Sequence, residues 1–67
     1  MKICVHFFGG EEKIVELPDG AKILDLLKEL GINRETILVK MDGKIVPEEE
    51  ELRNGAEVTI FHVVTGG

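Results

Sequence analysis

The sequence finishes with the residues VVTGG, and its last two glycines, Gly66 and Gly67, are the first candidates for chemistry. Glycine has no side chain to pack and loses the most conformational freedom on ordering, so the pair adds nothing to the stability of a fold. The interpretation that we favour is that these residues are the working part of the chain, outside the packed domain. The alternative is a frayed end without function, since chain termini tolerate almost any sequence.

The other side chains that could react are one cysteine, Cys4, and two histidines, His6 and His62. Alternation along a strand would place Cys4 and His6 on one face and His62 on the other, so we do not expect the three to converge. A structural zinc site needs four ligands, and a solitary strand cysteine is more often a small apolar residue than a nucleophile. Paired carboxylates, a phosphate-binding loop and a Ser-His-acid set are also missing. The sequence therefore predicts a protein that is not an enzyme, holds no metal and needs no cofactor of its own.

Length and charge restrict the class of protein and its partners. A chain of 67 residues forms one domain with one small core. Its 13 acidic and 8 basic residues give a net charge of −5, which argues against nucleic acid, since binding to phosphate backbones depends on clustered Lys and Arg. An acidic surface suits a partner protein with a basic docking face, although solubility alone would also explain it.

Several features predict a cytoplasmic protein. No secretion signal is visible after Met1, and no apolar run approaches the 18 residues of a membrane span. A single thiol fits a reducing compartment. We therefore expect no membrane partner, and we expect the free domain to be a monomer.

Six segments with regular periodicity precede the glycines. KICVHFF and EEKIVEL alternate as two strands of a hairpin, and TILVKMDGKIV forms a second hairpin around Asp42-Gly43. Between the hairpins, AKILDLLKELG has a helical stripe of Ile23, Leu26, Leu27 and Leu30, with Gly31 as its left-handed stop and Asp19 as the best available N-cap. AEVTIFHVV is the last strand.

This order, ββαβββ, predicts an α+β roll in which one helix covers one face of a mixed sheet. The first and last strands would be neighbours. The other sheet face would remain open and would carry apolar and polar side chains that point away from the helix: Leu38, Thr59, Phe61, Val63, Cys4, His6 and Phe8. An uncovered face with Phe and Val beside the C-terminal residues is a candidate docking surface.

A chain of this layout and length, with VKMDGKIVPEEEELRNGAEV in its second half and VVTGG at its end, resembles the ThiS/MoaD-type ubiquitin-like sulfur carriers and their archaeal small-modifier relatives. The resemblance covers essentially the whole chain. It implies a ubiquitin-like β-grasp domain over residues 1–63 and a flexible C-terminal Gly-Gly tail over residues 64–67. Extended at about 3.3 Å per residue, that tail would reach roughly 13 Å beyond the strand.

The resemblance also implies a reaction and two partners. An ATP-dependent activating enzyme would adenylate the Gly67 carboxylate, which would then become a thiocarboxylate and deliver sulfur to a biosynthetic enzyme. Gly66 and Thr65 would thread the activating enzyme's cleft. Four residues of the open face, Phe61, Val63, Leu38 and His6, would dock that enzyme.

Four matters stay open at the level of sequence. Thiamine, molybdopterin or tungstopterin synthesis and tRNA thiolation are all possible destinations of the sulfur. A small modifier conjugated to target lysines would need the same terminus and surface. A plain β-grasp interaction module would use the sheet face and ignore the tail. The acidic run Glu48–Glu51 could meet a basic rim of a partner, but a solvated loop explains it as well.

Overall fold

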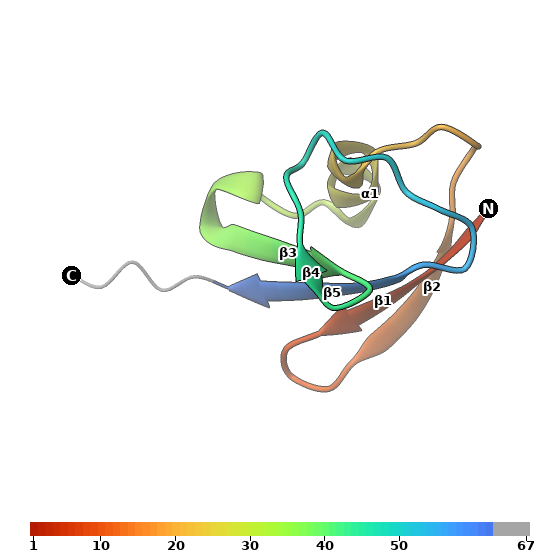
Figure 1. Ribbon diagram of the computed structural model, residues 1–67. Coiled ribbons are helices and arrows are strands. Elements are labelled where there is room, and N and C mark those ends of the chain that lie inside the picture. The colour runs from red at the N-terminus through yellow and green to blue at the C-terminus, as the bar shows by residue number, and fades with distance from the viewer. Residues whose placement is uncertain (63–67) are drawn as a thin grey trace.

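The computed structural model describes residues 1–62, and in that part of the chain the elements follow the predicted order (Figure 1). Their bounds are β1 Lys2–Phe7, β2 Glu12–Glu16, α1 Ile23–Leu30, a short 3-10 helix Arg34–Thr36, β3 Ile37–Met41, β4 Lys44–Ile45 and β5 Glu57–His62. Neither helix within residues 1–62 is long and apolar enough to cross a membrane.

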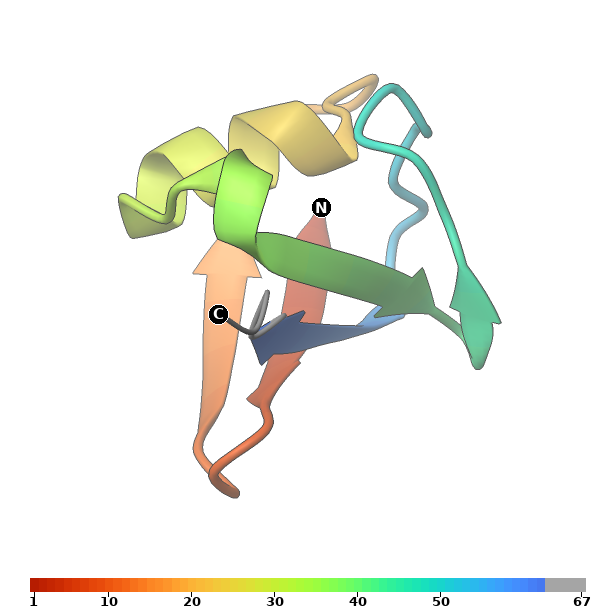
Figure 2. The ribbon, with the colours of Figure 1, turned by 90° about the vertical axis from the view of Figure 1, so that its left-hand side faces the viewer.

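The strands form one mixed sheet in the order β2-β1-β5-β3-β4. The first and last strands are neighbours, as predicted: β1 and β5 run parallel, with Val5 opposite Val58 and Phe7 opposite Ile60. The other pairs are antiparallel. Figures 1 and 2, which differ by a quarter turn, both show α1 on one side of the sheet only. The predicted α+β roll is therefore confirmed, and one sheet face has no helix over it.

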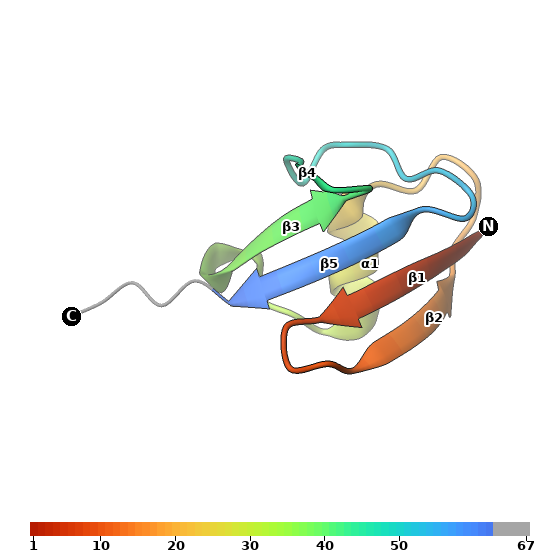
Figure 3. The ribbon, with the colours of Figure 1, turned by 60° about the horizontal axis from the view of Figure 1, so that its bottom comes forward.

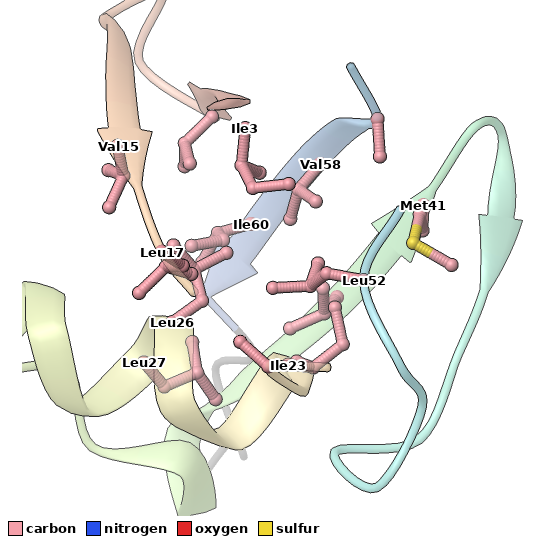
Figure 4. Close-up of a cluster of buried hydrophobic side chains, with 14 of the residues drawn as sticks. Ile3, Val15, Leu17, Ile23, Leu26, Leu27, Met41, Leu52, Val58 and Ile60 are labelled. Atoms are coloured by element: carbon pink, nitrogen blue, oxygen red, sulfur yellow. The ribbon is translucent and has the colours of Figure 1, made fainter. Parts of the chain in front are cut away.

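The core lies between α1 and the sheet (Figure 4). The strands contribute the side chains that alternate toward α1, and α1 contributes the apolar stripe that faces the sheet. Predicted inward residues are buried throughout, with Phe7 and Leu30 partly buried at the margin. The buried set is Ile3, Val5, Val15, Leu17, Ala21, Ile23, Leu26, Leu27, Ile37, Val39, Met41, Leu52, Ala56, Val58 and Ile60. Such a core uses the inward faces for packing, so chemistry has to come from the open face or the chain end.

The start of α1 differs from the sequence-based expectation. The N-cap is Lys22 and not Asp19, and the Oδ2 atom of Asp25 accepts a hydrogen bond of 2.8 Å from the Lys22 N–H. The free N–H groups of the first turn donate to the backbone of the acidic loop, from Ile23 to the Glu50 carbonyl and from Leu24 to the Glu48 carbonyl, both at 2.9 Å. Because tertiary contacts satisfy these donors, the helix needs no capping side chain before it.

The end of α1 agrees with the sequence. Gly31 adopts a φ of 71°, and its N–H and that of Ile32 donate to carbonyls of the last turn. An added Cβ at Gly31 would meet no atom within 4 Å, so only the backbone conformation requires glycine here.

We predict that Gly31→Ala lowers the free energy of unfolding by about 1 kcal/mol, since a left-handed conformation is strained for a residue with a Cβ. Urea unfolding followed by circular dichroism measures the change. Gly9→Ala is the matched control, because its surroundings are equally open and its φ is not positive. Equal stability of the two variants would show that the Gly31 conformation relaxes without cost.

The second hairpin forms at the predicted turn. Asp42 and Gly43 have φ values of 50° and 86°, the two positive values that a tight two-residue turn requires. Asp42 also ties the turn to the rest of the sheet: its Oδ1 accepts from the Glu57 N–H at 3.1 Å, and its Oδ2 accepts from Arg53 at 3.0 Å. The turn therefore fixes where β5 begins.

Candidate functional site: the open sheet face

The face of the sheet opposite α1 is the candidate site, and Figure 3 looks onto it with the helix behind. Strand alternation shows which residues belong to this face: a strand residue whose two neighbours point toward α1 and are buried has its own side chain on the opposite face. From β1 and the turn after it come Cys4, His6 and Phe8; from β2, Glu12 and Ile14; from β5, Glu57, Thr59 and Phe61; from β3, Leu38 and Lys40. The predicted orientation of Leu38, Phe61 and His6 is confirmed.

Four of these side chains form an aromatic patch, defined here as Phe8, Leu38, Lys40 and Phe61. The rings of Phe8 and Phe61 lie 5.8 Å apart at 54°, and the Lys40 Nζ lies 5.4 Å from the centre of the Phe61 ring. Leu38 stands opposite Phe61 in the β3–β5 register. Phe8 is 77% exposed and Leu38 46% exposed, a large apolar area to leave in water on so small a domain.

The patch lies beside the last described residues of β5. Phe61 is the penultimate residue of that strand, which ends at His62. The patch therefore includes a side chain from the end of β5, the central strand of the sheet in Figure 3. A protein that covered the patch would also be adjacent to the point from which residues 63–67 continue.

Sequence reasoning placed Phe8 on this face but did not include it, or Lys40, among the docking residues. Phe8 could have been included because it follows His6 by two residues, so strand alternation continued one residue past β1 places both side chains on the same face. The contact of Lys40 with Phe61 could not be predicted from the sequence, because it depends on the pairing of β3 with β5. The remaining predicted site residues, Val63, Thr65, Gly66 and Gly67, lie outside the described residues, as does the predicted domain boundary between residues 63 and 64.

Polar side chains form a second group on the same face. The Sγ of Cys4 lies 3.5 Å from the Nε2 of His6, and the Nδ1 of His6 lies 3.2 Å from the Oε1 of Glu12. His62 pairs with Ile37 at the other side of β5, so the three residues considered from the sequence do not meet. Within residues 1–62, no three His, Cys, Asp or Glu side chains could hold a metal ion together.

A shallow hollow of about 310 Å³ lies between α1 and the β3–β4 edge, and it shares Leu38 with the aromatic patch. Its lining residues are six apolar ones, Leu27, Ile37, Leu38, Val39, Val46 and Pro47, and two acidic ones, Glu48 and Glu49. Among the described residues that line this hollow there is no nucleophilic side chain and no histidine. We therefore regard the hollow as a surface for packing.

Comparisons of sequence connect the chain to known proteins. A sequence model of the ThiS family matches residues 5–67, Gly66 and Gly67 included. An uncharacterized protein of Archaeoglobus fulgidus is 37% identical over 68 residues, which span 100% of each chain. The sulfur carrier protein TtuB of Thermus thermophilus is 28% identical over 57 residues, which cover 85% of this chain and 88% of TtuB.

Comparisons of structure agree on the fold. A putative molybdopterin converting factor, subunit 1, from Pyrococcus furiosus matches with a TM-score of 0.80 and 27% identity over 94% of this chain and 98% of its own. SAMP1 from Haloferax volcanii matches with a TM-score of 0.81 and 20% identity over 100% of both chains. The UBL domain of Plasmodium falciparum Dsk2 matches with a TM-score of 0.76 and 21% identity over 92% of this chain and 96% of its own. The predicted ubiquitin-like β-grasp fold is confirmed.

Proposed function

Because the chain belongs to the ThiS family of small ubiquitin-like carriers, which are not themselves enzymes, we propose that it carries sulfur as a thiocarboxylate on Gly67. The observation that carries the proposal is that the family match continues through Gly66 and Gly67. Carriers of this family work with activating enzymes and with sulfur-accepting enzymes. Both are the proposed partners here, and the cytoplasm is the proposed compartment.

The chemistry explains why a carboxylate has to be activated. A carboxylate is a poor electrophile, because its negative charge repels a nucleophile and oxide is a poor leaving group. Joining Gly67 to AMP, with release of pyrophosphate from ATP, supplies a good leaving group. A persulfide of the partner then attacks the carbonyl carbon, and AMP departs. The partner's site has to stabilise the oxyanion that forms in between. A second thiolate of the partner cleaves the S–S bond of the resulting acyl disulfide, so that the thiocarboxylate leaves and a disulfide remains on the partner.

The chain's own contribution is access and docking. Gly66 and Gly67 let the acyl carbon approach a buried nucleotide, since neither presents a Cβ to the cleft wall. Thr65 and Val63 would lead into that cleft. The aromatic patch and His6 would hold the activating enzyme against the open sheet face. Burial of Phe8 and Phe61 would supply much of the affinity, because aromatic side chains at the centre of an interface commonly dominate binding.

Charge complementarity favours the same partner face. With a net charge of −5, the domain is attracted to a basic surface at long range and is oriented before contact. Lys40 is the basic member of the aromatic patch, so an acidic group of the partner beside the Phe61 ring would fit it. We propose that the acceptor of the sulfur is an enzyme of cofactor synthesis, for thiamine or for molybdopterin or tungstopterin, or of tRNA thiolation.

Incubation with the activating enzyme of the native cell, ATP and Mg²⁺ tests the proposal. Intact-mass spectrometry should show a chain that gains one AMP and loses one water, and fragmentation should place the adduct on Gly67. A control without ATP shows no adduct. An enzyme that binds the chain with its usual affinity and never transfers AMP would contradict the proposal.

We predict that Phe61→Ala weakens binding to the activating enzyme at least tenfold, a loss of about 1.4 kcal/mol or more, as expected for an aromatic anchor. Phe8→Ala should have a smaller effect of the same sign, because it removes one half of the ring pair. Titration calorimetry gives both affinities. Ile14→Ala is the matched control, since Ile14 is 71% exposed on the same face but lies on the edge strand β2. A loss for Phe61→Ala no larger than the loss for Ile14→Ala would show that the aromatic patch does not anchor the interface.

A further inference from the structure

Cys4 carries the single thiol of the sequence, and the proposed function leaves it without a role. Its Sγ lies 3.5 Å from the Nε2 of His6, whose Nδ1 lies 3.2 Å from the Oε1 of Glu12. The sheet places these three side chains side by side. Cys4 and His6 are two residues apart on β1 and so point to the same face, and Glu12 on β2 is the register partner of His6. A nucleophile, a base and an acid that orients the base are arranged here as in sites with an activated nucleophile.

The hydrogen-bond partners assign the proton on His6. An ionised Glu12 can only accept, so the Nδ1 of His6 carries the hydrogen, and the lone pair of Nε2 faces the thiol. Transfer of the thiol proton to Nε2 would give a thiolate beside an imidazolium, and Glu12 would stabilise that imidazolium. The His6 side chain is 31% exposed and Glu12 67% exposed, so the group is open to small molecules from solvent.

The neighbouring charges make the thiolate dependent on His6. Glu57 stands opposite Cys4 on β5 and would repel a thiolate, whereas Lys2, two residues before Cys4 on β1, would attract it. On the other side, Ile14 faces Cys4 from β2 and brings no charge, and Thr59 stands beside His6 on β5. Among these neighbours, His6 is the base whose ring nitrogen contacts the Cys4 Sγ.

We propose that Cys4 is a thiol–disulfide exchange site for small-molecule disulfides, with His6 as its base and Glu12 as the residue that positions His6. The Cys4 proton passes to Nε2, and the thiolate attacks one sulfur of the disulfide. The disulfide's S–S bond breaks as the Cys4–S bond forms. The leaving thiolate recovers the proton from His6, so a mixed disulfide and one free thiol result, with the disulfide as the only oxidant.

The position of the adduct gives the exchange a consequence. A group attached to Cys4 would stand on the open sheet face beside His6, in the surface proposed for docking. The mixed disulfide would therefore hinder the activating enzyme, and a reducing thiol would restore docking. This consequence depends on the proposed function, whereas the exchange reaction does not.

Reaction with dithiodipyridine, an uncharged disulfide that releases an absorbing thione, tests the exchange. At about pH 6.5 a free cysteine is only about one per cent ionised. The native protein should therefore react at least tenfold faster than the same chain unfolded in urea. A thiol that was merely half-buried would react more slowly in the native state, and that result, or equal rates, would overturn the proposal.

Variants assign the roles. Cys4→Ser should not react, His6→Gln should lose the native advantage entirely, and Glu12→Gln should lose part of it and shift the rate profile to higher pH. His62→Gln is the matched control and should react as wild type, because His62 lies outside the group. Wild-type rates in His6→Gln across the pH range would overturn the role of His6, with circular dichroism verifying that the variant is folded.

The two proposals can fail separately. Exchange at Cys4 is measured with the protein alone, and AMP transfer to Gly67 is measured with the reduced protein and the activating enzyme. Binding of the Cys4 mixed disulfide with a small acidic thiol should be at least tenfold weaker than binding of the reduced protein. Unchanged binding would overturn the effect on docking.

Discussion

We predict that deletion of Gly66 and Gly67 abolishes acyl-adenylate formation, while binding to the activating enzyme stays within about threefold of wild type. The expectation follows from the separation of docking and reaction along the chain. The aromatic patch lies on β3, on β5 and on the turn after β1, within the described residues, whereas the proposed acyl group lies beyond them. Removing two residues shortens the reach by roughly 7 Å at 3.3 Å per residue, which leaves the carboxylate far from the nucleotide.

Two further variants distinguish the effect of tail length from the effect of side-chain size in the tail. Gly66→Val keeps the length of the chain but adds a branched side chain in the proposed cleft, so it should bind and fail to react. Addition of one residue after Gly67 removes the carboxylate from its position and should fail as well. Adenylation of the deletion variant at Thr65 would contradict the role given to the glycines. Loss of binding together with reaction would show that the tail, and not the patch, holds the partner.

We predict that Leu26→Ala removes about half or more of the free energy of unfolding of an average domain of this size. Leu26 is fully buried between α1 and the sheet (Figure 4), and a buried Leu→Ala change costs about 3–5 kcal/mol through lost transfer energy and the cavity that remains. A domain of this size has a total stability of only about 3–10 kcal/mol at 0.05–0.15 kcal/mol per residue. Urea unfolding monitored by circular dichroism measures the loss.

Leu24→Ala is the matched control for this change, since the same side chain is removed from the same helix at a partly exposed position. We expect it to cost less than about 1.5 kcal/mol, because solvent fills the space that the side chain leaves. Equal costs at the two positions would mean that α1 is not anchored through the stripe that contains Leu26.

Much of the fold could be predicted because local patterns and tertiary contacts agree. Ile37, Val39 and Met41 alternate with outward residues and are buried, and Asp42-Gly43 turns the chain as its residue types require. The start of α1 could not be predicted, because backbone carbonyls of Glu48 and Glu50, distant in sequence, bind its free N–H groups. The N-cap preference for Ser, Thr, Asp and Asn considers only the residues next to the helix start, so it cannot predict a contact with a distant loop.

The site was predicted as a face and not as groups of contacting residues. Parity along a strand suffices to place Phe61 and Leu38 away from the helix. The contact of Phe8 with Phe61 and the contact of His6 with Glu12 depend instead on which strands pair and in which register. The sequence favours a small apolar role for Cys4 for the same reason, since the contact of Glu12 with His6 depends on the pairing of β1 with β2.

The most direct test of the central proposal is the mass of the protein isolated from its native cell. A carrier of sulfur on Gly67 should include a population about 16 Da heavier than the unmodified chain, because sulfur replaces one carboxylate oxygen in the activated acyl group. Fragmentation should place the gain on the last residue, and alkylation of the thiocarboxylate should label it there. A chain that is always unmodified at Gly67, in cells whose activating enzyme and sulfur donor are active, would contradict the account.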